Sequence, residues 1–478
     1  MIEFSSPDGI TPRPYQQEAV EAWMHNNGQG ILHMATGTGK TLTSLFAAEH
    51  LQDLQDGRLG LVVVAPYQHL VDQWVTELRA FGVTPYRAYQ SRQTWENDVA
   101  GAITEFRHGA RDVFAVVTTQ QTFATDHFQA QLDRLPGHET LLIADEVHHM
   151  GAPHLRTALP VDIRARLGLS ATPERWYDEE GTTALETYFS GGVVFEYGLK
   201  QAISNGHLCE YYYLPHIVGL TPEEAEEYRA ISKAIGKRLA SGDDDSLAAL
   251  DEDEQLQQLL FRRARLVGTA EQKLELLTDL VERSRPLDHT LVYCGDGSVE
   301  RPASGTGEDR DVVRQLSAAT EILGTRLGLS VHQFTYEEDQ ETRERLLDEF
   351  ERGELDALVA IRCLDEGVDV PATETAFMLA SSTNPRQFVQ RRGRILRLHE
   401  SKEYATIHDF VVRPPPAVVT DENDPAFQIE RNLVRRELER VATFVDGAKN
   451  HPDAAPSGIP TTSGSITDLK KDFNLLDV

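Results

Sequence analysis

The sequence has 478 residues, of which 40% are apolar, so we expect a globular protein of two or three domains. No stretch approaches the ~18 apolar residues of a membrane span, and residues 1–6 have neither the basic region nor the apolar core of a secretory signal. The formal net charge of −30 excludes a generally basic surface, but it does not exclude a local basic groove for nucleic acid.

The first motif along the chain is Thr-Pro-Arg-Pro-Tyr-Gln at residues 11–16. A side-chain amide such as that of Gln16 can read an adenine edge, because it accepts from one group and donates to another. Arg13 and Gln16 are therefore candidate contacts for a nucleotide. An ordinary helix start is the alternative for this motif taken alone.

A glycine-rich loop follows an apolar run at residues 30–33 and opens a helical segment at residues 42–54. Glycines let backbone N–H groups turn inward, and the helix N-terminus adds a positive dipole end, so this unit can cradle a triphosphate. Lys40 would reach the β- and γ-phosphates, and the Thr41 hydroxyl would bind Mg²⁺. The strict pattern has glycine where Met34 stands, so a chance glycine-rich turn is the alternative. The predicted phosphate-binding residues are Thr36, Gly37, Thr38, Gly39, Lys40 and Thr41.

Two adjacent acids end a second apolar run, Leu-Leu-Ile-Ala-Asp-Glu-Val-His at residues 141–148. This pattern predicts a buried parallel strand that delivers carboxylates to its carboxyl end. Phosphoryl transfer needs one carboxylate to hold Mg²⁺ and one to orient or deprotonate the attacking water. We assign Asp145 to the metal and Glu146 to the water. An acidic turn after a core strand is the alternative for an isolated pair, but the order of the two motifs argues against coincidence.

Short apolar runs alternate with amphipathic segments as far as residue 173, which predicts a doubly wound α/β domain with a parallel sheet. Further strands are expected at residues 59–65, 112–117 and 166–169, with a helix at 69–81. Ligands bind such sheets at the carboxyl ends of the strands.

Several of these strands run into small or polar residues. Such residues suit a phosphodiester backbone through N–H and hydroxyl groups, although turn chemistry is a fair alternative. The hydroxyls of the Ser-Ala-Thr-Pro segment at residues 170–173 could couple hydrolysis to movement. The candidate nucleic-acid contacts are Pro66, Gln68, Thr118, Thr119 and Gln120.

The second half begins with a transition zone at residues 193–218, which a helical insertion follows at about 221–283. A second α/β series comes next, and its loop at residues 295–309 is rich in glycine and charge and is expected to be mobile. One amphipathic helix is expected at about 426–444, followed by a flexible tail from 447. The predicted strands of the second series occupy residues 289–293, 330–334, 355–361, 375–379 and 404–411, with a helix at 337–352.

Two polar motifs lie in this second series. Acids and a glycine follow a strand in Asp-Glu-Gly-Val-Asp-Val-Pro at residues 365–371, and arginines crowd the helical stretch Gln-Arg-Arg-Gly-Arg-Ile-Leu-Arg at residues 390–397. Arginines at such density repel one another unless anionic partners are present, and guanidinium groups grip phosphate oxygens in a bidentate manner. A solvated basic helix face is the alternative.

The charged residues number 76 acidic and 46 basic, and only nine of the basic residues are lysines. Such a surface stays hydrated where salt screens ordinary electrostatics, so we interpret it as adaptation to a high-salt cytoplasm. Avoidance of non-specific polyanion binding is the alternative. The three cysteines, Cys209, Cys294 and Cys363, form no CxxC motif, which argues against structural zinc or disulfides and for a cytoplasmic location.

The ordered set of motifs resembles the superfamily 2 helicases of the DEAD/DEAH type, with Asp-Glu-Val-His as the acid motif, over about residues 11–412. The motifs Arg-Pro-Tyr-Gln, Ser-Ala-Thr-Pro and Gln-Arg-Arg-Gly-Arg-Ile-Leu-Arg look most like those of the XPB-type and related DNA translocases. The chain is also similar to compact helicases of bacterial and archaeal DNA-defence operons, including those linked to phosphorothioate modification.

The resemblance implies two RecA-like domains that clamp ATP and Mg²⁺, at residues 1–205 and 206–412, with a C-terminal helix and flexible tail at 413–478. Gln16 would then recognise adenine, and Arg391 would tie the acid motif to the second domain. Gln390, Arg394 and Arg397 would reach the γ-phosphate, while Gly367 and Asp369 would line the nucleotide and nucleic-acid edges of the second domain.

Two departures put a repair-factor role in doubt. XPB-type proteins carry a damage-recognition domain before the first motif, and only about ten residues precede that motif in this chain. Their Arg-Glu-Asp signature is replaced by the segment at residues 173–178.

The sequence therefore predicts an ATP-dependent DNA helicase or translocase with contacts mainly to the DNA backbone, in DNA repair or in restriction and defence. An RNA helicase is one alternative. A nucleotide-gated scaffold that recruits a nuclease without moving along DNA is the other. No nuclease motif is evident in the chain itself, and His148 and His149 are interpreted as domain-interface residues in preference to metal ligands.

Overall fold

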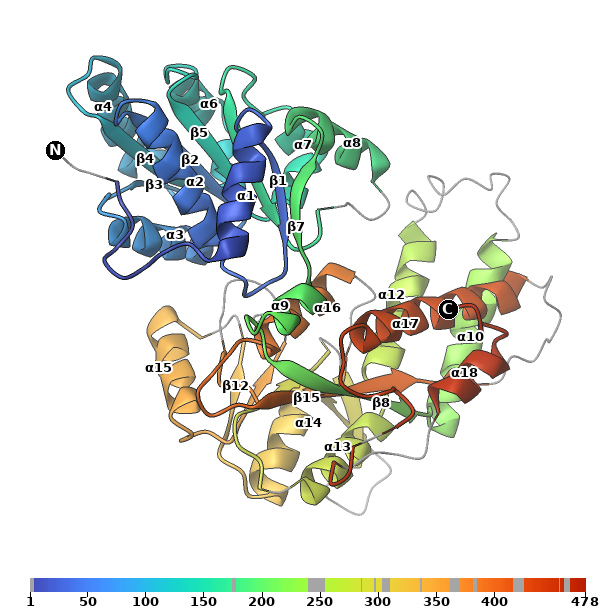
Figure 1. The fold of residues 1–478 in the computed structure, drawn as a ribbon. Helices are drawn as coiled ribbons and strands as arrows, with labels where there is room; N and C mark the ends of the chain where they lie inside the picture. The colour runs from blue at the N-terminus through green and yellow to red at the C-terminus, as the bar shows by residue number, and fades with distance from the viewer. Residues whose placement is uncertain are drawn as a thin grey trace. The chain divides into compact units, whose positions relative to one another are not determined.

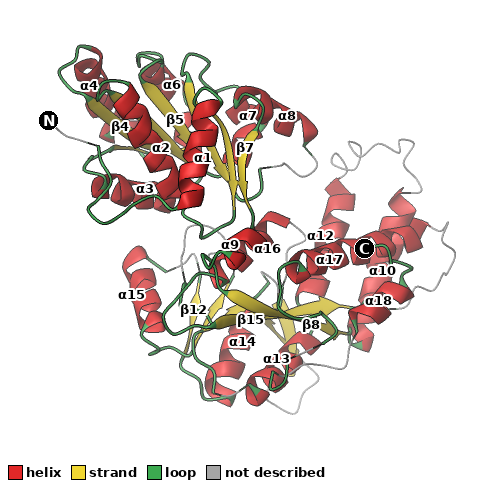
Figure 2. Ribbon diagram, in the orientation of Figure 1, coloured by secondary structure: helices red, strands yellow, loops and turns green. Residues whose placement is uncertain are grey.

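The computed structural model describes residues 4–478, except for residues 174–177, 240–253, 285, 296–297, 303–309, 336–337, 362–369, 381–384, 416–424, 455 and 460–464. The chain divides into two compact units, Met1–Asn205 and Gly206–Val478 (Figure 1). Each unit has a parallel sheet with helices around it (Figure 2), so the predicted α/β class with two parallel-sheet domains is confirmed. No described helix is both long enough and apolar enough to cross a membrane.

Seven parallel strands form the sheet of the first unit, in the order β3-β4-β2-β5-β6-β1-β7. The strands are β1 (Gln29–Met34), β2 (Leu59–Ala65), β3 (Tyr86–Ala88), β4 (Val113–Thr119), β5 (Thr140–Ala144), β6 (Ala165–Ser170) and β7 (Val193–Tyr197). The helices are α1 (Pro14–His25), α2 (Lys40–Leu54), α3 (Gln68–Ala80), η1 (Arg92–Thr94), α4 (Glu96–Arg107), α5 (Gln120–Phe123), α6 (Asp126–Leu132), η2 (Val147–Gly151), α7 (Pro153–Arg156), α8 (Glu179–Tyr188) and α9 (Leu199–Ser204). The two outermost strands, β3 and β7, were not expected, and β7 lies inside the predicted transition zone.

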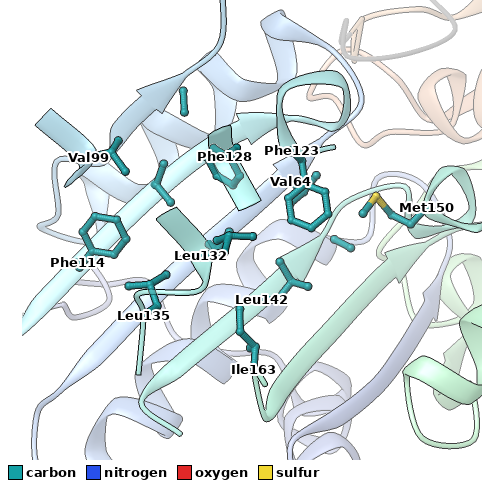
Figure 3. Packing of buried hydrophobic residues seen from close by; sticks show 14 of the residues in the cluster. Val64, Val99, Phe114, Phe123, Phe128, Leu132, Leu135, Leu142, Met150 and Ile163 are labelled. Atoms are coloured by element: carbon teal, nitrogen blue, oxygen red, sulfur yellow. The ribbon is translucent and has the colours of Figure 1, made fainter. Parts of the chain in front are cut away.

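The central strands of the first sheet are buried on both faces because their sequences are nearly continuous apolar runs. Every residue of β2 and of β4 is buried. On one face, Phe114 and Leu142 of the strands join Val99, Phe123 and Phe128 of the covering helices in one core (Figure 3). This packing holds the carboxyl ends of neighbouring strands together at one edge of the sheet, and the predicted polar motifs follow those ends.

Six parallel strands form the main sheet of the second unit, in the order β12-β13-β9-β14-β15-β8. The strands of this unit are β8 (Glu210–Val218), β9 (Thr290–Tyr293), β10 (Ser298–Pro302), β11 (Arg310–Arg314), β12 (Val331–Phe334), β13 (Ala357–Ala360), β14 (Thr375–Met378) and β15 (Tyr404–Val412). The helices are α10 (Pro222–Leu239), α12 (Glu254–Gly268), α13 (Gln272–Arg283), α14 (Gln315–Glu321), η3 (Ile322–Arg326), α15 (Gln340–Glu351), α16 (Pro385–Ile395), α17 (Pro425–Val445) and α18 (Ile466–Asp472).

The loop predicted to be mobile at residues 295–309 contains regular structure. Its strand β10 pairs with β11 in an antiparallel hairpin. Residues 303–309 of that loop lie outside the described residues, as does the acidic stretch 241–245 of the predicted insertion. Glycine and charge alone did not distinguish a hairpin from an irregular loop here.

The helical insertion predicted for residues 221–283 divides into two parts. Helices α10 and α12 pack against each other, with an ion pair of 2.7 Å between Arg262 and Glu227, and α10 also packs on α17 (Figure 1). Helix α13 instead places Leu277 in the main core of the second unit. The insertion is therefore residues 222–268, and α13 is a covering helix of the sheet.

The C-terminal segment expected to be flexible from residue 447 is folded wherever the structure describes it. Helix α18 buries Leu469, and Leu475 beyond it is fully buried. Asp453 accepts a hydrogen bond of 2.8 Å from the Ile466 N–H, which fixes the start of this helix. The polar composition of the tail concealed these few apolar residues, which are too short a series to show a helical period.

The same segment covers the edge of the second sheet. The Asn450 side chain accepts from the Tyr213 N–H and donates to the Tyr213 carbonyl, both at 2.9 Å. The Lys449 N–H donates to the Tyr211 carbonyl at 2.9 Å. The edge strand β8 therefore pairs with the chain's own C-terminal segment, which blocks edge-to-edge association with another chain.

A buried ion pair joins α17 to this sheet. Arg440 and Asp409 are 1% and 0% exposed and form a direct hydrogen bond, while the Tyr213 hydroxyl donates to Asp409 at 2.6 Å. Arg440 also bonds Glu437 at 2.7 Å. Burial costs both charges their hydration, so each depends on the other.

We expect Arg440→Met to lower the free energy of unfolding by about 3–5 kcal/mol, because it leaves the Asp409 charge buried without its partner. Urea unfolding of the full chain, followed by circular dichroism, measures the loss. The matched control is Arg435→Met, whose half-exposed pair with Asp477 should contribute under about 1 kcal/mol. Equal losses in the two variants would contradict the prediction.

Candidate nucleotide-binding site

The glycine-rich loop joins β1 to α2 in the conformation that phosphate binding requires. Gly37 and Gly39 have φ angles of 87° and 80°, in the left-handed region that favours glycine. Gly39 is also the N-cap of α2, and a Cβ atom there would lie only 3.0 Å from the Gln16 amide nitrogen. The loop therefore directs the first N–H groups of a 15-residue helix toward its concave side.

Lys40 lies in the first turn of α2, and its side chain folds back over the loop. Its Nζ donates to the Met34 carbonyl at 3.2 Å, at the end of β1. Burial raises the pKa of Asp145, and the Lys40 charge opposes this rise, so the two side chains interact electrostatically. The two predicted motifs, which are 105 positions apart, therefore meet at one edge of the first sheet.

Asp145 follows β5 and is oriented by two hydrogen bonds. The Trp74 indole donates to Oδ2 and the Glu146 N–H donates to Oδ1, both at 2.9 Å. Burial raises the pKa of Asp145, whereas the Trp74 bond, the Lys40 charge and the Glu146 amide act in the opposite direction. The carboxylate is thus held in one orientation.

Glu146 has a strained backbone and sits in a chain of polar contacts. Its φ of 44° and ψ of 54° are left-handed, which is uncommon outside glycine and occurs at functional sites. Its carboxylate lies 3.4 Å from His148 Nδ1, which also contacts the Ser170 hydroxyl at 3.1 Å. Ser170 in turn accepts from the Thr172 N–H at 3.0 Å. Because β6 lies between β1 and β5, Ser170 stands between the loop and the acid pair.

The assignment of the histidine pair to a domain interface is wrong for His148. Its side chain is 1% exposed and joins Glu146 to Ser170 inside the first unit. Among the described residues, no group of three or more histidine, cysteine, aspartate or glutamate side chains could hold a metal.

The first motif of the chain supports the loop from the other side. The Gln16 amide accepts from the Arg13 N–H at 2.9 Å and donates to Thr43 Oγ1 at 3.2 Å, so its polar atoms bond to the protein in this structure. The Tyr15 hydroxyl donates to the Thr38 carbonyl at 2.6 Å, and its ring stacks on Tyr197 with 4.1 Å between centroids. Tyr15 and Gln16 therefore help to fix the position of the glycine-rich loop.

The candidate nucleic-acid contacts differ in their exposure. Gln68 is exposed and Pro66 is half-buried at the end of β2. Thr118 is fully buried and donates to the Ala88 carbonyl at 2.6 Å, so its hydroxyl supports the edge strand and does not face a ligand. Thr119 caps α5 through its hydroxyl, and Gln120 is buried at 7% exposure.

Two arginines of α16 contact backbone carbonyls and aromatic rings of the second unit. Arg391 donates to the Ala380 carbonyl at 3.0 Å and lies over the Tyr293 ring at 4.9 Å. Arg392 donates to the Thr443 carbonyl of α17 and lies over the Phe444 ring at 5.3 Å. Arg392 is therefore held against α17 by uncharged groups.

The other predicted residues of the second unit are placed in part. Gln390 and Arg394 on α16 are buried. Burial lowers the pKa of Arg397 to about 10, which leaves the side chain charged at neutral pH. Gly367 and Asp369 lie outside the described residues.

Three site residues escaped the sequence reasoning. Trp74 and Tyr197 act through contacts between distant segments, so no local pattern reveals them. Tyr67 had a signal, because it stands between the candidates Pro66 and Gln68. It is 43% exposed and stacks on His69 with 5.7 Å between ring centroids.

The residues present fit a nucleoside triphosphate with Mg²⁺. The Thr36 hydroxyl is buried without a hydrogen-bond partner among the described residues, as expected of a group that awaits a ligand. Thr41 in the first turn of α2 and the oriented Asp145 would supply the one or two protein oxygens that Mg²⁺ usually takes beside phosphate. A glycine loop before a helix, with a carboxylate pair two strands away, defines a P-loop NTPase.

Comparison with known proteins gives the family. Residues 9–175 match the model described as "Type III restriction enzyme, res subunit", and residues 272–399 match "Helicase conserved C-terminal domain". The "DNA 3'-5' translocase XPB2" of Sulfurisphaera tokodaii is 26% identical over 82% of this chain and 79% of its own length. The "DNA 3'-5' helicase XPB" of Kineococcus radiotolerans is 26% identical over 96% of this chain and 68% of its own length.

A solved structure of the same architecture supports the fold. The helicase domain of Pyrococcus furiosus Hef matches with a TM-score of 0.50 and 15% identical residues, over 84% of this chain and 95% of that domain. The chain belongs to the superfamily 2 helicases and is of the XPB type. It is therefore an ATP-hydrolysing enzyme, and its two units are RecA-like domains.

Proposed function

We propose that this chain is an ATP-driven DNA helicase or translocase. The observation that carries the proposal is the placement of Lys40 and Asp145 at the carboxyl ends of β1 and β5, which flank β6 in one parallel sheet. Two relatives are named for 3'-5' movement or unwinding on DNA, which favours DNA over the RNA alternative.

In this proposal the loop of residues 36–41 binds the phosphates of ATP, and Lys40 stabilises negative charge on the β- and γ-phosphates. Glu146 orients the attacking water, and its strained backbone and its contact with His148 fix the direction of the carboxylate. Thr41 and Asp145 hold Mg²⁺, which when bound neutralises charge on the phosphate oxygens. In this proposal Gln16 recognises the adenine base, and Arg13 lies beside Gln16.

The second unit completes the site in the closed state. Gln390, Arg394 and Arg397 contact the γ-phosphate, and Gly367 and Asp369 line the same edge. ATP binding favours closure of the two units, and loss of the γ-phosphate favours opening. The contact of His148 with both Glu146 and Ser170 provides a route by which nucleic-acid binding changes hydrolysis.

The nucleic acid runs along the carboxyl ends of the strands, where Pro66 and Gln68 follow β2 and where Thr119 and Gln120 lie at the end of β4. Contacts there are mainly to the backbone, so binding tolerates any base sequence. The exposed ring of Tyr67 adds a surface on which one base can stack.

We expect Tyr67→Ala to weaken the binding of single-stranded DNA by about 5- to 100-fold, because stacking of a base on an aromatic ring contributes about 1–3 kcal/mol. Fluorescence anisotropy with a labelled oligonucleotide measures the affinity. Tyr67→Phe is the matched control and should bind like the wild type. An oligonucleotide with abasic sites at every position should bind the wild type and Tyr67→Ala with equal affinity. If Tyr67→Ala instead loses as much affinity for this strand as for ordinary DNA, the ring does not act by stacking on a base.

The decisive experiment compares ATP hydrolysis in the presence of single-stranded DNA, duplex DNA and RNA. Stimulation by DNA and not by RNA supports the proposal, and the reverse result supports an RNA helicase. A triplex-displacement assay separates movement from static binding, since a nucleotide-gated scaffold leaves the third strand in place. The assays are run at moderate and at molar salt, because phosphate contacts weaken steeply as salt rises.

A role in restriction and defence is the second candidate. The match of residues 9–175 to a restriction-enzyme subunit favours it. In that setting the chain would act in the cytoplasm with a separate nuclease, and its acidic, lysine-poor composition would suit high salt. Retention of activity in molar potassium chloride tests the adaptation, and co-purification with a nuclease activity tests the partner.

A further inference from the structure

Arg392 connects the arginine-rich helix α16 to the last turn of α17. Its Nη1 donates to the Thr443 carbonyl and lies 3.4 Å from the Tyr211 hydroxyl, and its guanidinium group covers the Phe444 ring at 5.3 Å. Phe388, one turn earlier on α16, packs on the same Phe444 ring with 5.6 Å between centroids. Arg392 itself is only 6% exposed.

The last turn of α17 is in turn held firmly on the sheet. The Tyr211 hydroxyl donates to the Phe444 carbonyl at 2.5 Å, and the Tyr213 ring stacks on Phe444 with 5.0 Å between centroids. One turn earlier, Arg440 forms the buried pair with Asp409. Arg392 therefore bonds to a part of α17 that is itself fixed to the sheet, and not to a frayed helix end.

The neighbouring Arg391 holds α16 from another side. It bonds to the Ala380 carbonyl after β14 and lies over Tyr293 of β9. Successive residues of a helix point about 100° apart, so these two arginines restrain both the rotation and the position of α16. Gln390 and Arg394 are four residues apart and so lie on one face of α16, and Arg397 follows two residues beyond the end of the helix.

We propose that Arg392 is a positioning residue for ATP hydrolysis, and that helix α17 is the support against which it sets the face of α16 carrying Gln390 and Arg394, with Arg397 just beyond the helix end. The proposal rests on the proposed function, because it requires that this face acts on the γ-phosphate. Arg392 touches neither nucleotide nor nucleic acid in this scheme. A displacement of about 1 Å at a transferring phosphate costs about 100-fold in rate, so a small tilt of α16 is enough to matter.

The central test is Arg392→Gln, which keeps a hydrogen-bond donor but removes the charge and the planar group that covers Phe444. We expect kcat for DNA-stimulated ATP hydrolysis to fall about 100-fold, with KM for ATP within about twofold of wild type. Arg392→Lys should recover part of kcat, because its ammonium group can still donate to the Thr443 carbonyl. A purely stabilising residue would instead lower the unfolding midpoint without changing kcat of the folded protein.

Variants on the α17 side test the same contact without touching α16. Phe444→Leu should lower kcat, and adding it to Arg392→Gln should cost little more, because the two changes remove one interaction. Tyr211→Phe removes one hydroxyl and should have a smaller effect of the same kind. The control is Arg435→Gln, also on α17, whose half-exposed pair with Asp477 lies away from α16 and which should leave kcat unchanged.

Arg394→Ala is measured in parallel to separate the two proposals. If wild type and Arg394→Ala hydrolyse ATP equally, the role of the α16 face fails, and the positioning role of Arg392 with it, whereas the proposed function is tested separately by stimulation with DNA and RNA. If Arg394→Ala loses activity while folded Arg392→Gln keeps the wild-type kcat, only the positioning role of Arg392 is overturned. If Arg394→Ala and Arg392→Gln both lose kcat but the effects of Arg392→Gln and Phe444→Leu are additive, α17 is not the support.

Discussion

Glu146→Gln should reduce DNA-stimulated ATP hydrolysis by at least about 100-fold, the lower end of what a positioned general base contributes. Glutamine keeps the size of the side chain but can neither accept a proton nor attract a water as strongly. Lys40→Ala should cause a loss of similar size, because it removes the positive charge at the β- and γ-phosphates. A coupled assay of phosphate release with saturating DNA measures both.

ATP binding separates the two variants. Glu146→Gln should bind a fluorescent ATP analogue about as well as wild type, whereas Lys40→Ala should bind it more weakly, because only lysine contacts the ground-state phosphates. Glu179→Gln, an exposed acid in the first turn of α8, is the matched control and should retain full activity. Undiminished turnover in Glu146→Gln would remove Glu146 from the reaction.

Removal of either arginine proposed to contact the γ-phosphate should reduce ATP hydrolysis at least as much as Glu146→Gln does. We expect Arg394→Ala or Arg397→Ala to lower kcat by about 10³- to 10⁵-fold, the range found for arginine fingers. Lysine at either position should recover little, since it lacks the planar, two-pronged group that matches phosphate oxygens. Single-turnover hydrolysis with pre-bound ATP measures the chemical step directly.

The control for this prediction is Arg352→Ala, which removes an exposed arginine paired with Asp348 at 2.8 Å on α15. It should leave kcat within about twofold, because exposed pairs contribute little. If Arg394→Ala and Arg397→Ala both behave like this control, the second unit takes no part in hydrolysis.

Much of the architecture was predictable because its signals are local. The apolar runs of β2 and β4 and the glycines of the phosphate loop each report a backbone conformation within a few residues. Gly37 and Gly39 have positive φ, as the triphosphate cradle requires. The order of motifs along the chain then indicated the family, which the comparisons confirm.

Other expectations failed where the deciding contact joins distant segments. The exact limit of the insertion depends on which core receives Leu277 of α13, and the folded tail depends on the site that receives Leu475. Thr118 looked like a ligand contact because it ends a strand, but the neighbouring edge strand buries its hydroxyl. The sequence pattern of a polar residue at a strand end is the same whether its side chain faces solvent or bonds to a neighbouring strand.

The sequence by itself determined the parallel sheets and the glycine loop and supplied the candidate acids and arginines, since chemistry and backbone geometry restrict residue types at each position. Only the tertiary structure decided how those groups are held. It placed Trp74 on Asp145, linked Glu146 through His148 to Ser170, and set Arg392 against α17. These contacts depend on which segments the strand order brings together, and that order arises from the packing of the whole domain.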